Sequence, residues 1–236
     1  MNKTAIITGG TKGIGLGIAQ SLLDDGYNVV ITSRTESSAQ EIANTLKTNK
    51  DNRAIGLGCD VRDYNSQVAC VTKTKELFGS IDVVIANAGV GHFSPIEEMT
   101  VENWNATIDT NLTGVFYSTK ASIDALKESK GYLITIASLA GTNFFPKGSA
   151  YNASKFGLVG FTQSVMLDLR KYGIKVTTIM PGSVATHFNG NTPSDQDNWK
   201  IQPEDLGQMV SDLLKINPRT LPSKIEVRPT IPGGSK

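Results

Sequence analysis

The stretch Thr8-Gly9-Gly10-Thr11-Lys12-Gly13-Ile14-Gly15 decides the fold, since it joins a short apolar run, Thr4–Thr8, to a helical pattern. Glycines let the backbone turn tightly and come close to a ligand that a Cβ atom would keep away. The N-terminus of the following helix offers unpaired N–H groups and a partial positive charge, which together suit a pyrophosphate. The spacing is neither Gly-x-Gly-x-x-Gly nor that of a P-loop. Its place in the first strand–helix unit favours a dinucleotide site over an ordinary glycine turn.

Short apolar runs alternate with longer amphipathic stretches along the whole chain. The runs predict strands at Thr4–Thr8, Asn28–Thr32, Ala54–Leu57, Ile81–Ala86, Tyr132–Ala137, Lys175–Met180 and Ile225–Arg228. The stretches between them predict helices at 14–26, 37–49, 63–78, 101–127, 150–172 and 203–215. This alternation implies a parallel sheet covered on both faces. The sequence therefore predicts an α/β fold with a doubly wound parallel sheet, and an irregular loop at 182–202 that serves function.

Length and composition exclude several classes of protein. The chain has 236 residues, which suits one domain over 1–236, and 23 basic against 22 acidic side chains. A net charge of +1 argues against a partner that is a nucleic acid or an anionic membrane. Two cysteines and two histidines make neither a disulfide framework nor a zinc site, so no metal is expected. No apolar run is long enough to span a membrane, and we expect a reduced, soluble, cytoplasmic protein.

The end of the second predicted strand bears on the choice of dinucleotide. It reads Ile31-Thr32-Ser33-Arg34, where an NAD-binding protein generally has an acid that holds the ribose 2′-hydroxyl. A guanidinium at this place can instead hold a 2′-phosphate, and Lys12 adds a second cation. Either side chain alone could be a solvated surface charge. Together they favour NADP over NAD.

The fifth predicted strand and the helix after it carry the groups for chemistry. The strand runs into Ser138, and Tyr151 and Lys155 follow four residues apart, on one face of a helix. An ammonium about 5 Å away would favour the phenolate by roughly 3 kcal/mol and bring the tyrosine pKa toward neutrality. The tyrosine could then act as a general acid or base, with Ser138 bonded to the same substrate oxygen.

At this point the sequence resembles the short-chain dehydrogenase/reductase family, over about residues 3 to 228. The motifs that carry the resemblance are Thr8-Gly9-x3-Gly13-x-Gly15, Asp60-Val61, Asn87-Ala88-Gly89, Asn111, Ser138, Tyr151-x3-Lys155 and Pro181-Gly182. It implies a seven-stranded Rossmann sheet and hydride transfer between a nicotinamide and a carbonyl or alcohol carbon. The sequence departs from the family at Asn87-Ala88-Gly89, which lacks a second alanine, and after Ile225–Arg228, where many members carry a glycine-rich segment.

The resemblance also implies roles for individual residues. Tyr151 would protonate the carbonyl oxygen that Ser138 polarises, Lys155 would lower the tyrosine pKa and bind the ribose, and Asn111 would hold a proton-relaying water. Asp60 would bond the adenine. The residues expected to contact NADP(H) are Gly9, Thr11, Lys12, Gly13, Ile14, Gly15, Ser33, Arg34, Asp60, Val61, Asn87, Ala88, Gly89, Tyr151, Lys155, Pro181, Gly182, Val184 and Thr186.

Several of these residues have plainer explanations. Asn87 and Asn111 could satisfy buried backbone groups, and Asp60 could cap the helix that begins near Asp63. His92 and His187 could line the substrate mouth or be ordinary loop residues. The aromatic side chains near the same loops could line a pocket for aryl or alkyl ketones or only pack beneath the loops; they are Phe93, Phe144, Phe145, Phe188 and Trp199.

The function expected from the sequence is NADPH-dependent reduction of a small or medium-sized ketone or aldehyde. A 3-oxoacyl-acyl-carrier-protein reductase is the alternative, for which Lys147 and Lys200 would supply a basic patch. A non-catalytic NADP sensor or scaffold is an alternative of another class, and the intact set Asn111, Ser138, Tyr151 and Lys155 argues against it. The helices at 101–127 and 150–172 carry more small and apolar residues than one sheet face needs. With the family resemblance, they predict a homotetramer or a homodimer.

Overall fold

The computed structural model describes residues 2–48 and 51–231, and a seven-stranded sheet forms its centre. The strand order is β3-β2-β1-β4-β5-β6-β7, and every neighbouring pair is parallel. The strands are β1 (Thr4–Thr8), β2 (Asn28–Ser33), β3 (Ala54–Gly58), β4 (Val83–Ala86), β5 (Tyr132–Ile136), β6 (Lys175–Pro181) and β7 (Lys224–Val227). The predicted fold class, a doubly wound parallel α/β sheet, is confirmed.

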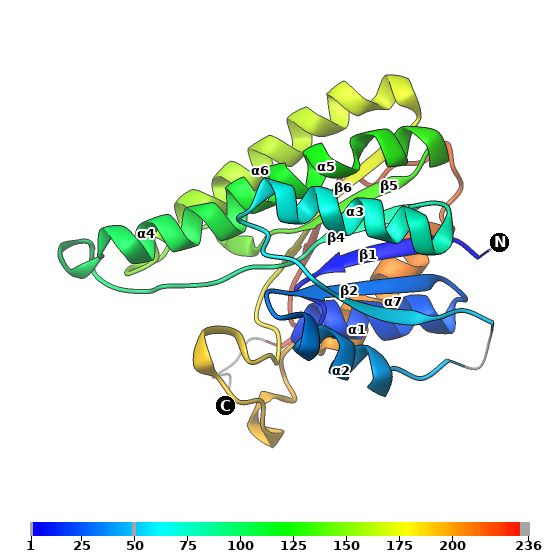
Figure 1. The fold of residues 1–236 in the computed structure, drawn as a ribbon. Coiled ribbons are helices and arrows are strands. Elements are labelled where there is room, and N and C mark those ends of the chain that lie inside the picture. Colours follow the sequence, from blue (N-terminus) through cyan, green and yellow to red (C-terminus); the bar gives the residue numbers. More distant parts are fainter. Residues whose placement is uncertain (1, 49–50, 232–236) are drawn as a thin grey trace.

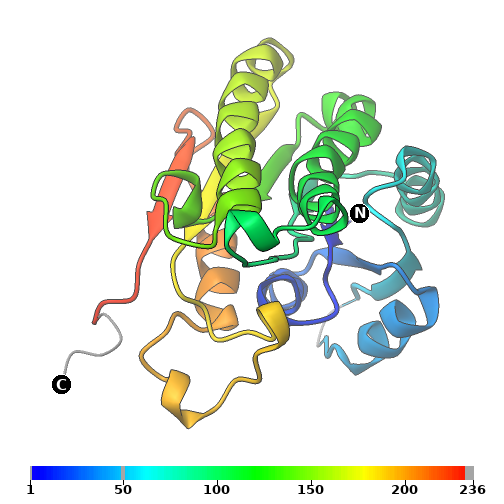
Figure 2. The same cartoon turned by 90° about the vertical axis from the view of Figure 1, so that its left-hand side faces the viewer.

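Helices cover both faces of this sheet. They are α1 (Gly13–Asp24), α2 (Glu36–Thr45), α3 (Tyr64–Phe78), α4 (Val101–Ile108), α5 (Gly114–Ser129), α6 (Ser149–Leu169) and α7 (Pro203–Lys215). Figures 1 and 2 show α1, α2 and α7 on one face and α3, α5 and α6 on the other, with α4 projecting beyond the sheet. The topology changes direction between β1 and β4, which in open α/β sheets is where a crevice for ligands forms.

The alternation of side chains along the central strands divides the core into two layers. Ile7 and Ile31 pack with α1 and α7, whereas their neighbours Ile6 and Val30 pack with α3, α5 and α6. Successive side chains of a strand point to opposite faces, so an uninterrupted apolar run fills both layers. Ile7 and Ile31 are 0% exposed.

The predicted elements are all present, with shifted boundaries and one correction. The helix predicted at 101–127 is not continuous: α4 ends at Ile108, a five-residue π-helical turn follows at Asp109–Thr113, and α5 begins at Gly114. Asn111 sits in this turn rather than in a regular helix. A π-helical turn places one extra residue in the helix, a feature often seen at functional sites. The helix predicted at 37–49 ends at Thr45, and residue 49 lies outside the described residues.

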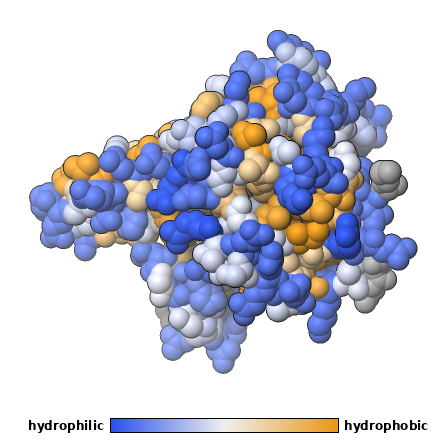
Figure 3. Space-filling model, in the orientation of Figure 1, coloured by the Kyte–Doolittle hydropathy of each residue, from blue (hydrophilic) through white to orange (hydrophobic). Residues whose placement is uncertain are grey.

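The outward faces of α4, α5 and α6 expose large apolar side chains. Val101 is 68% exposed, Trp104 38%, Phe116 45%, Phe156 43% and Leu167 60%. Figure 3 shows hydrophobic surface at the outer end of the projection that α4 forms. Within residues 2–48 and 51–231, no helix combines the length and apolarity needed to span a bilayer.

Candidate active site

The loop between β1 and α1 forms a cradle that only glycine can build. A Cβ on Gly15 would lie 2.5 Å from the carbonyl oxygen of Gly9 and 2.6 Å from the side-chain nitrogen of Asn87. Gly9 and Gly13 have φ angles of 64° and 55°, which side-chain-bearing residues rarely adopt. We call this loop with Asn87 the glycine cradle (Gly9–Gly15 and Asn87).

Helix α1 enters the cradle with its first turn uncapped. Lys12 occupies the N-cap position and makes no side-chain bond to the helix, whereas Asp63 accepts the backbone N–H of Asn65 at the start of α3. The first N–H groups of a helix lack partners within it and suit an anion. The cradle and the uncapped helix together fit the pyrophosphate of a dinucleotide, with Thr11, Lys12 and Ile14 at the helix entrance.

Asn87 and Thr8 tie the ends of β1 and β4 together. The Asn87 side chain donates to the carbonyl oxygens of Thr8 and Gly9, at 2.9 and 3.0 Å. The Thr8 hydroxyl in turn accepts the backbone N–H groups of Asn87 and Ala88, at 3.0 and 3.1 Å. Asn87 therefore satisfies backbone groups, which was the alternative to a role in cofactor binding. These bonds also fix the shape of the cradle.

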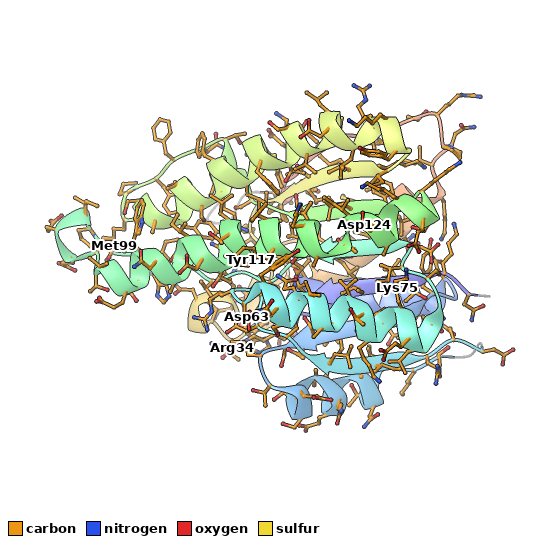
Figure 4. The ribbon with its side chains drawn as sticks, turned by 45° about the horizontal axis from the view of Figure 1, so that its top comes forward. Arg34, Asp63, Lys75, Met99, Tyr117 and Asp124 are labelled. Carbon is orange, nitrogen blue, oxygen red and sulfur yellow. The ribbon has the colours of Figure 1, made fainter. Side chains whose placement is uncertain are left out.

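The end of β2 and the turn after β3 bring several charges together. Arg62 donates to both carboxylate oxygens of Asp60, at 3.0 and 2.6 Å, and this bond is the main reason that the pKa of Asp60 lies below its usual value. The charge of Arg34, which lies close by, lowers it further. Figure 4 shows Arg34 at the same end of the molecule as Asp63, which opens α3.

The contact with adenine expected of Asp60 stays a prediction, and its carboxylate already accepts from Arg62. The alternative explanation, that Asp60 caps α3, is wrong, because the capping side chain is Asp63. Arg62 is a cation that the sequence analysis missed. Its position two residues after Asp60 in the Asp-Val-Arg stretch was the available signal. Val61 packs inward and is 8% exposed.

Lys155 is the centre of a second group of side chains. It is 4% exposed, and its ammonium donates to the carbonyl oxygen of Ile136 at 3.0 Å. A Cβ on Gly89 would lie 3.8 Å from the Lys155 nitrogen and 3.3 Å from the Asn111 side-chain oxygen, so all three residues meet. With Ser138 and Tyr151 they form what we call the tyrosine–lysine cluster (Gly89, Asn111, Ser138, Tyr151 and Lys155).

Asn111 fixes the loop that follows β4. Its side chain accepts the backbone N–H of Val90 and donates to the carbonyl oxygen of Val90, both at 2.8 Å, and donates to the Ser154 hydroxyl at 3.0 Å. Its amide thus satisfies backbone groups, as the plainer explanation allows. These bonds position the backbone beside Gly89, and the expected water relay stays a prediction.

Burial raises the pKa of the Tyr151 phenol, and the neighbouring Ser138 hydroxyl offsets this only in part. Burial also lowers the pKa of Lys155 to about 8. The lysine nitrogen lies 5.7 Å from the centre of the Tyr151 ring. The predicted lowering of the tyrosine pKa is therefore wrong for this structure, because desolvation by burial is the largest influence on the phenol.

The end of β6 and the loop after it contact both the tyrosine–lysine cluster and the glycine cradle. The carbonyl oxygen of Pro181 lies 3.5 Å from the Ser138 hydroxyl, and the N–H of Gly182 donates to Val227. Val184 forms a bridge with Ile201, which holds the two ends of the 182–202 loop together. A Cβ on Gly13 would lie 3.2 Å from the Thr186 methyl group, so the loop reaches the cradle.

Three of the five aromatic side chains singled out in the sequence meet beside Tyr151. Ring centres lie 5.3 Å apart for Phe93 and Tyr151, 5.6 Å for Phe188 and Tyr151, and 5.9 Å for Phe93 and Phe145. Phe144 is 87% exposed, and the ring of Trp199 lies under the ammonium of Lys200. Phe93, Phe145 and Phe188 therefore pack beside Tyr151, and their lining of a substrate pocket stays a prediction.

Comparison with known proteins agrees with this geometry. The family model for short chain dehydrogenase matches residues 3–197. An uncharacterized oxidoreductase of Staphylococcus saprophyticus is 35% identical over 97% of both chains. The trans-4-hydroxycyclohexanecarboxylate dehydrogenase of Sinomonas cyclohexanicum is 34% identical over 90% of this chain and 84% of its own.

Solved structures place the fold in the same group. An alcohol dehydrogenase of the archaeon Thermococcus sibiricus, complexed with 5-hydroxy-NADP, superposes with a TM-score of 0.92 at 28% identity over 100% of both chains. A metagenomic short-chain oxidoreductase in complex with NADP gives 0.84 at 31% identity over 98% of both. The chain belongs to the short-chain dehydrogenase/reductase family of oxidoreductases.

Proposed function

We propose that the protein reduces small or medium-sized ketones and aldehydes with NADPH. The observation that carries this proposal is the proximity of Ser138 and Tyr151 beside a buried lysine, at the strand ends where the glycine cradle also lies. NADPH supplies the hydride when bound. Ser138 holds the carbonyl oxygen, and Tyr151 gives its phenolic proton to the oxygen as the carbon is reduced.

The raised pKa keeps the Tyr151 phenol protonated at neutral pH, the form that reduction requires. A phenol that stays protonated can donate a proton, whereas oxidation of an alcohol needs the phenolate as the base. Lys155, with a pKa of about 8, is mostly charged at pH 7, so its ammonium stabilises the phenolate once the proton has left. The Sinomonas relative is a dehydrogenase named for a hydroxy compound, which supports chemistry at a carbinol carbon.

The cations at the end of β2 support NADP over NAD. Arg34 is exposed beside Asp60, Arg62 lies in the same group, and Lys12 stands at the entrance to α1. The two solved relatives that carry NADP or its 5-hydroxy derivative support the same cofactor. The basic patch that a 3-oxoacyl carrier-protein substrate would need has less support. Lys200, one of its two lysines, is paired with Asp197 at 2.6 Å.

The test is NADPH oxidation across ketones, aldehydes, diketones and a 3-oxoacyl thioester, with NADH in parallel. We expect faster reduction of ketones with NADPH. Arg34→Ala should raise the KM for NADPH by about tenfold or more, because a charge-assisted bond to phosphate is lost, and leave NADH unchanged. Arg219→Ala, an exposed arginine of another loop, is the control. Equal rates with both nucleotides would contradict the cofactor assignment. Tight NADPH binding without turnover of any carbonyl would favour the sensor.

The exposed apolar faces of α4, α5 and α6 support self-association as a homotetramer or homodimer. Phe116 and Phe156, on α5 and α6, are nearly half exposed. A second copy of the chain could cover this apolar surface. Solution scattering that gives the mass of a monomer would contradict this proposal.

A further inference from the structure

Four aromatic rings converge where a substrate would meet Tyr151, and they come from four separate segments. Phe93 follows β4, Phe145 precedes α6, Phe188 lies in the loop after β6, and Tyr151 opens α6. The rings are tilted or edge-on to one another, with interplanar angles of 48° to 68°. We call Phe93, Phe145 and Phe188 the aromatic wall. Such angles are the ones that aromatic pairs prefer.

Packing and backbone hydrogen bonds fix the position of Phe188. A Cβ on Gly91 would lie 2.6 Å from the Phe188 ring, so only glycine lets the ring pack against this backbone. The backbone N–H of Phe188 bonds to the Thr186 hydroxyl at 3.3 Å, and its carbonyl oxygen accepts from the Asn191 side chain at 2.8 Å. Asn189 and Gly190 then take positive φ angles of 56° and 75°, which turn the chain away at once. The loop thus presents one ring to the site.

The polar groups of this corner are concentrated on one side. Ser138 and Tyr151 present hydroxyl groups, while the wall presents only carbon. A ligand at this corner would be oriented by few polar contacts and held by apolar ones. A substrate with a flat ring would place the ring against Phe93 and Phe188 and its carbonyl toward the two hydroxyls.

We propose that Phe188 selects the substrate, and that the site takes ketones whose carbonyl carries a flat aromatic ring. This inference rests on the proposed reduction of carbonyl compounds. An aryl ketone is intrinsically less reactive toward hydride than an alkyl ketone, because its ring conjugates with the carbonyl. A preference for the aryl ketone must therefore come from the protein.

The experiment compares acetophenone, cyclohexyl methyl ketone and butan-2-one as substrates of the NADPH-loaded enzyme. The first two differ in ring flatness and hardly in size. We expect kcat/KM for acetophenone to exceed that for the cyclohexyl ketone by about tenfold, the value of a good aromatic contact. Phe188→Leu should remove this advantage, so that kcat/KM falls about tenfold more for acetophenone than for butan-2-one. Phe144→Leu, at a mostly exposed ring, should keep it.

Calorimetry of acetophenone binding to the protein loaded with NADP⁺, in which no hydride is available, gives a second readout. Affinity that falls about tenfold in Phe188→Leu supports the inference even where turnover is absent. Absence of any carbonyl reduction by the wild type would defeat the proposed function and leave this binding result standing. Equal kcat/KM for the three ketones, or an equal loss for all three in Phe188→Leu, would overturn the inference.

Discussion

The glycine cradle and the tyrosine–lysine cluster lie at the same edge of the sheet but are built in opposite ways. The cradle is made of backbone: a Cβ at Gly15 has no room, and α1 starts without a side-chain cap. The cluster is made of side chains held by other side chains and carbonyl groups, as Lys155 is by Ile136 and Asn111 by Val90. The cradle depends on space being left empty, whereas the cluster depends on particular polar atoms being present. Substitutions should therefore fail differently in the two regions.

The largest effect is expected from Tyr151→Phe in the cluster. The variant keeps the ring that packs on Phe93 and Phe188 but lacks the proton that the reaction needs. We expect kcat to fall about 10³-fold, within the range for loss of a general acid, with a much smaller change in affinity for NADPH. Steady-state kinetics and nucleotide binding measure the two. Tyr172→Phe makes the same change at a half-exposed tyrosine and should leave both unchanged. Full activity in Tyr151→Phe would remove the tyrosine from the proposed chemistry.

The cluster should also make stability depend on pH through Lys155. Burial lowers its pKa to about 8 from 10.5, so between these values the unfolded chain binds the proton more tightly than the folded one. The free energy of unfolding should therefore rise with pH in this window, by about 3 kcal/mol in total, and the penalty is fully present below pH 8.

Urea unfolding of the wild type and of Lys155→Met between pH 7 and pH 10 isolates this contribution. The variant loses the bond to Ile136 at every pH, so only the difference in slope is diagnostic. Tyr151, whose pKa is raised, acts in the opposite sense but only above pH 10. Parallel curves for the two proteins would show that Lys155 does not titrate as its burial implies.

The difference between the two regions also explains what the sequence could predict. The strands and the sheet followed from apolar runs such as Ile6 and Ile7, because in a parallel sheet both faces are buried. The π-helical turn at Asn111 escaped prediction, since it arises where the side chain meets Val90, far away in the sequence. The direction of the Tyr151 pKa shift was wrong for a related reason. A spacing of four residues reports that Lys155 is near but not how deeply both groups are buried.

The shape of the cradle was easier to predict than the contacts near it. Gly9, Gly13 and Gly15 shape the loop through their lack of a side chain, which is visible in the sequence. Arg62 and Asp60 depend on a contact between two exposed side chains after β3, which spacing alone does not reveal. The aromatic wall depends on three loops meeting, and only the fold shows which of the five candidate rings take part.

The smallest effect is expected from filling the empty space of the cradle, compared with the same crowding elsewhere in the fold. Gly15→Ala would put a Cβ 2.5 Å from the Gly9 carbonyl oxygen and displace Asn87, so the backbone that we propose to face the pyrophosphate must shift. Gly207→Ala, between α7 and α1, also puts its Cβ 2.5 Å from a carbonyl oxygen, that of Gly17. Both variants should lose about 1–3 kcal/mol of stability through crowding.

Only Gly15→Ala should also weaken NADPH binding, by about tenfold, because its crowding falls on the surface proposed to contact the nucleotide. Calorimetric titration with NADPH, at a temperature where both variants are folded, measures this. An equal loss of affinity in the two variants would mean that the cradle acts through stability alone. Retained affinity in Gly15→Ala would mean that the backbone between Gly9 and Gly15 yields without cost to the bound phosphate, and the contrast with the tyrosine–lysine cluster would then be lost.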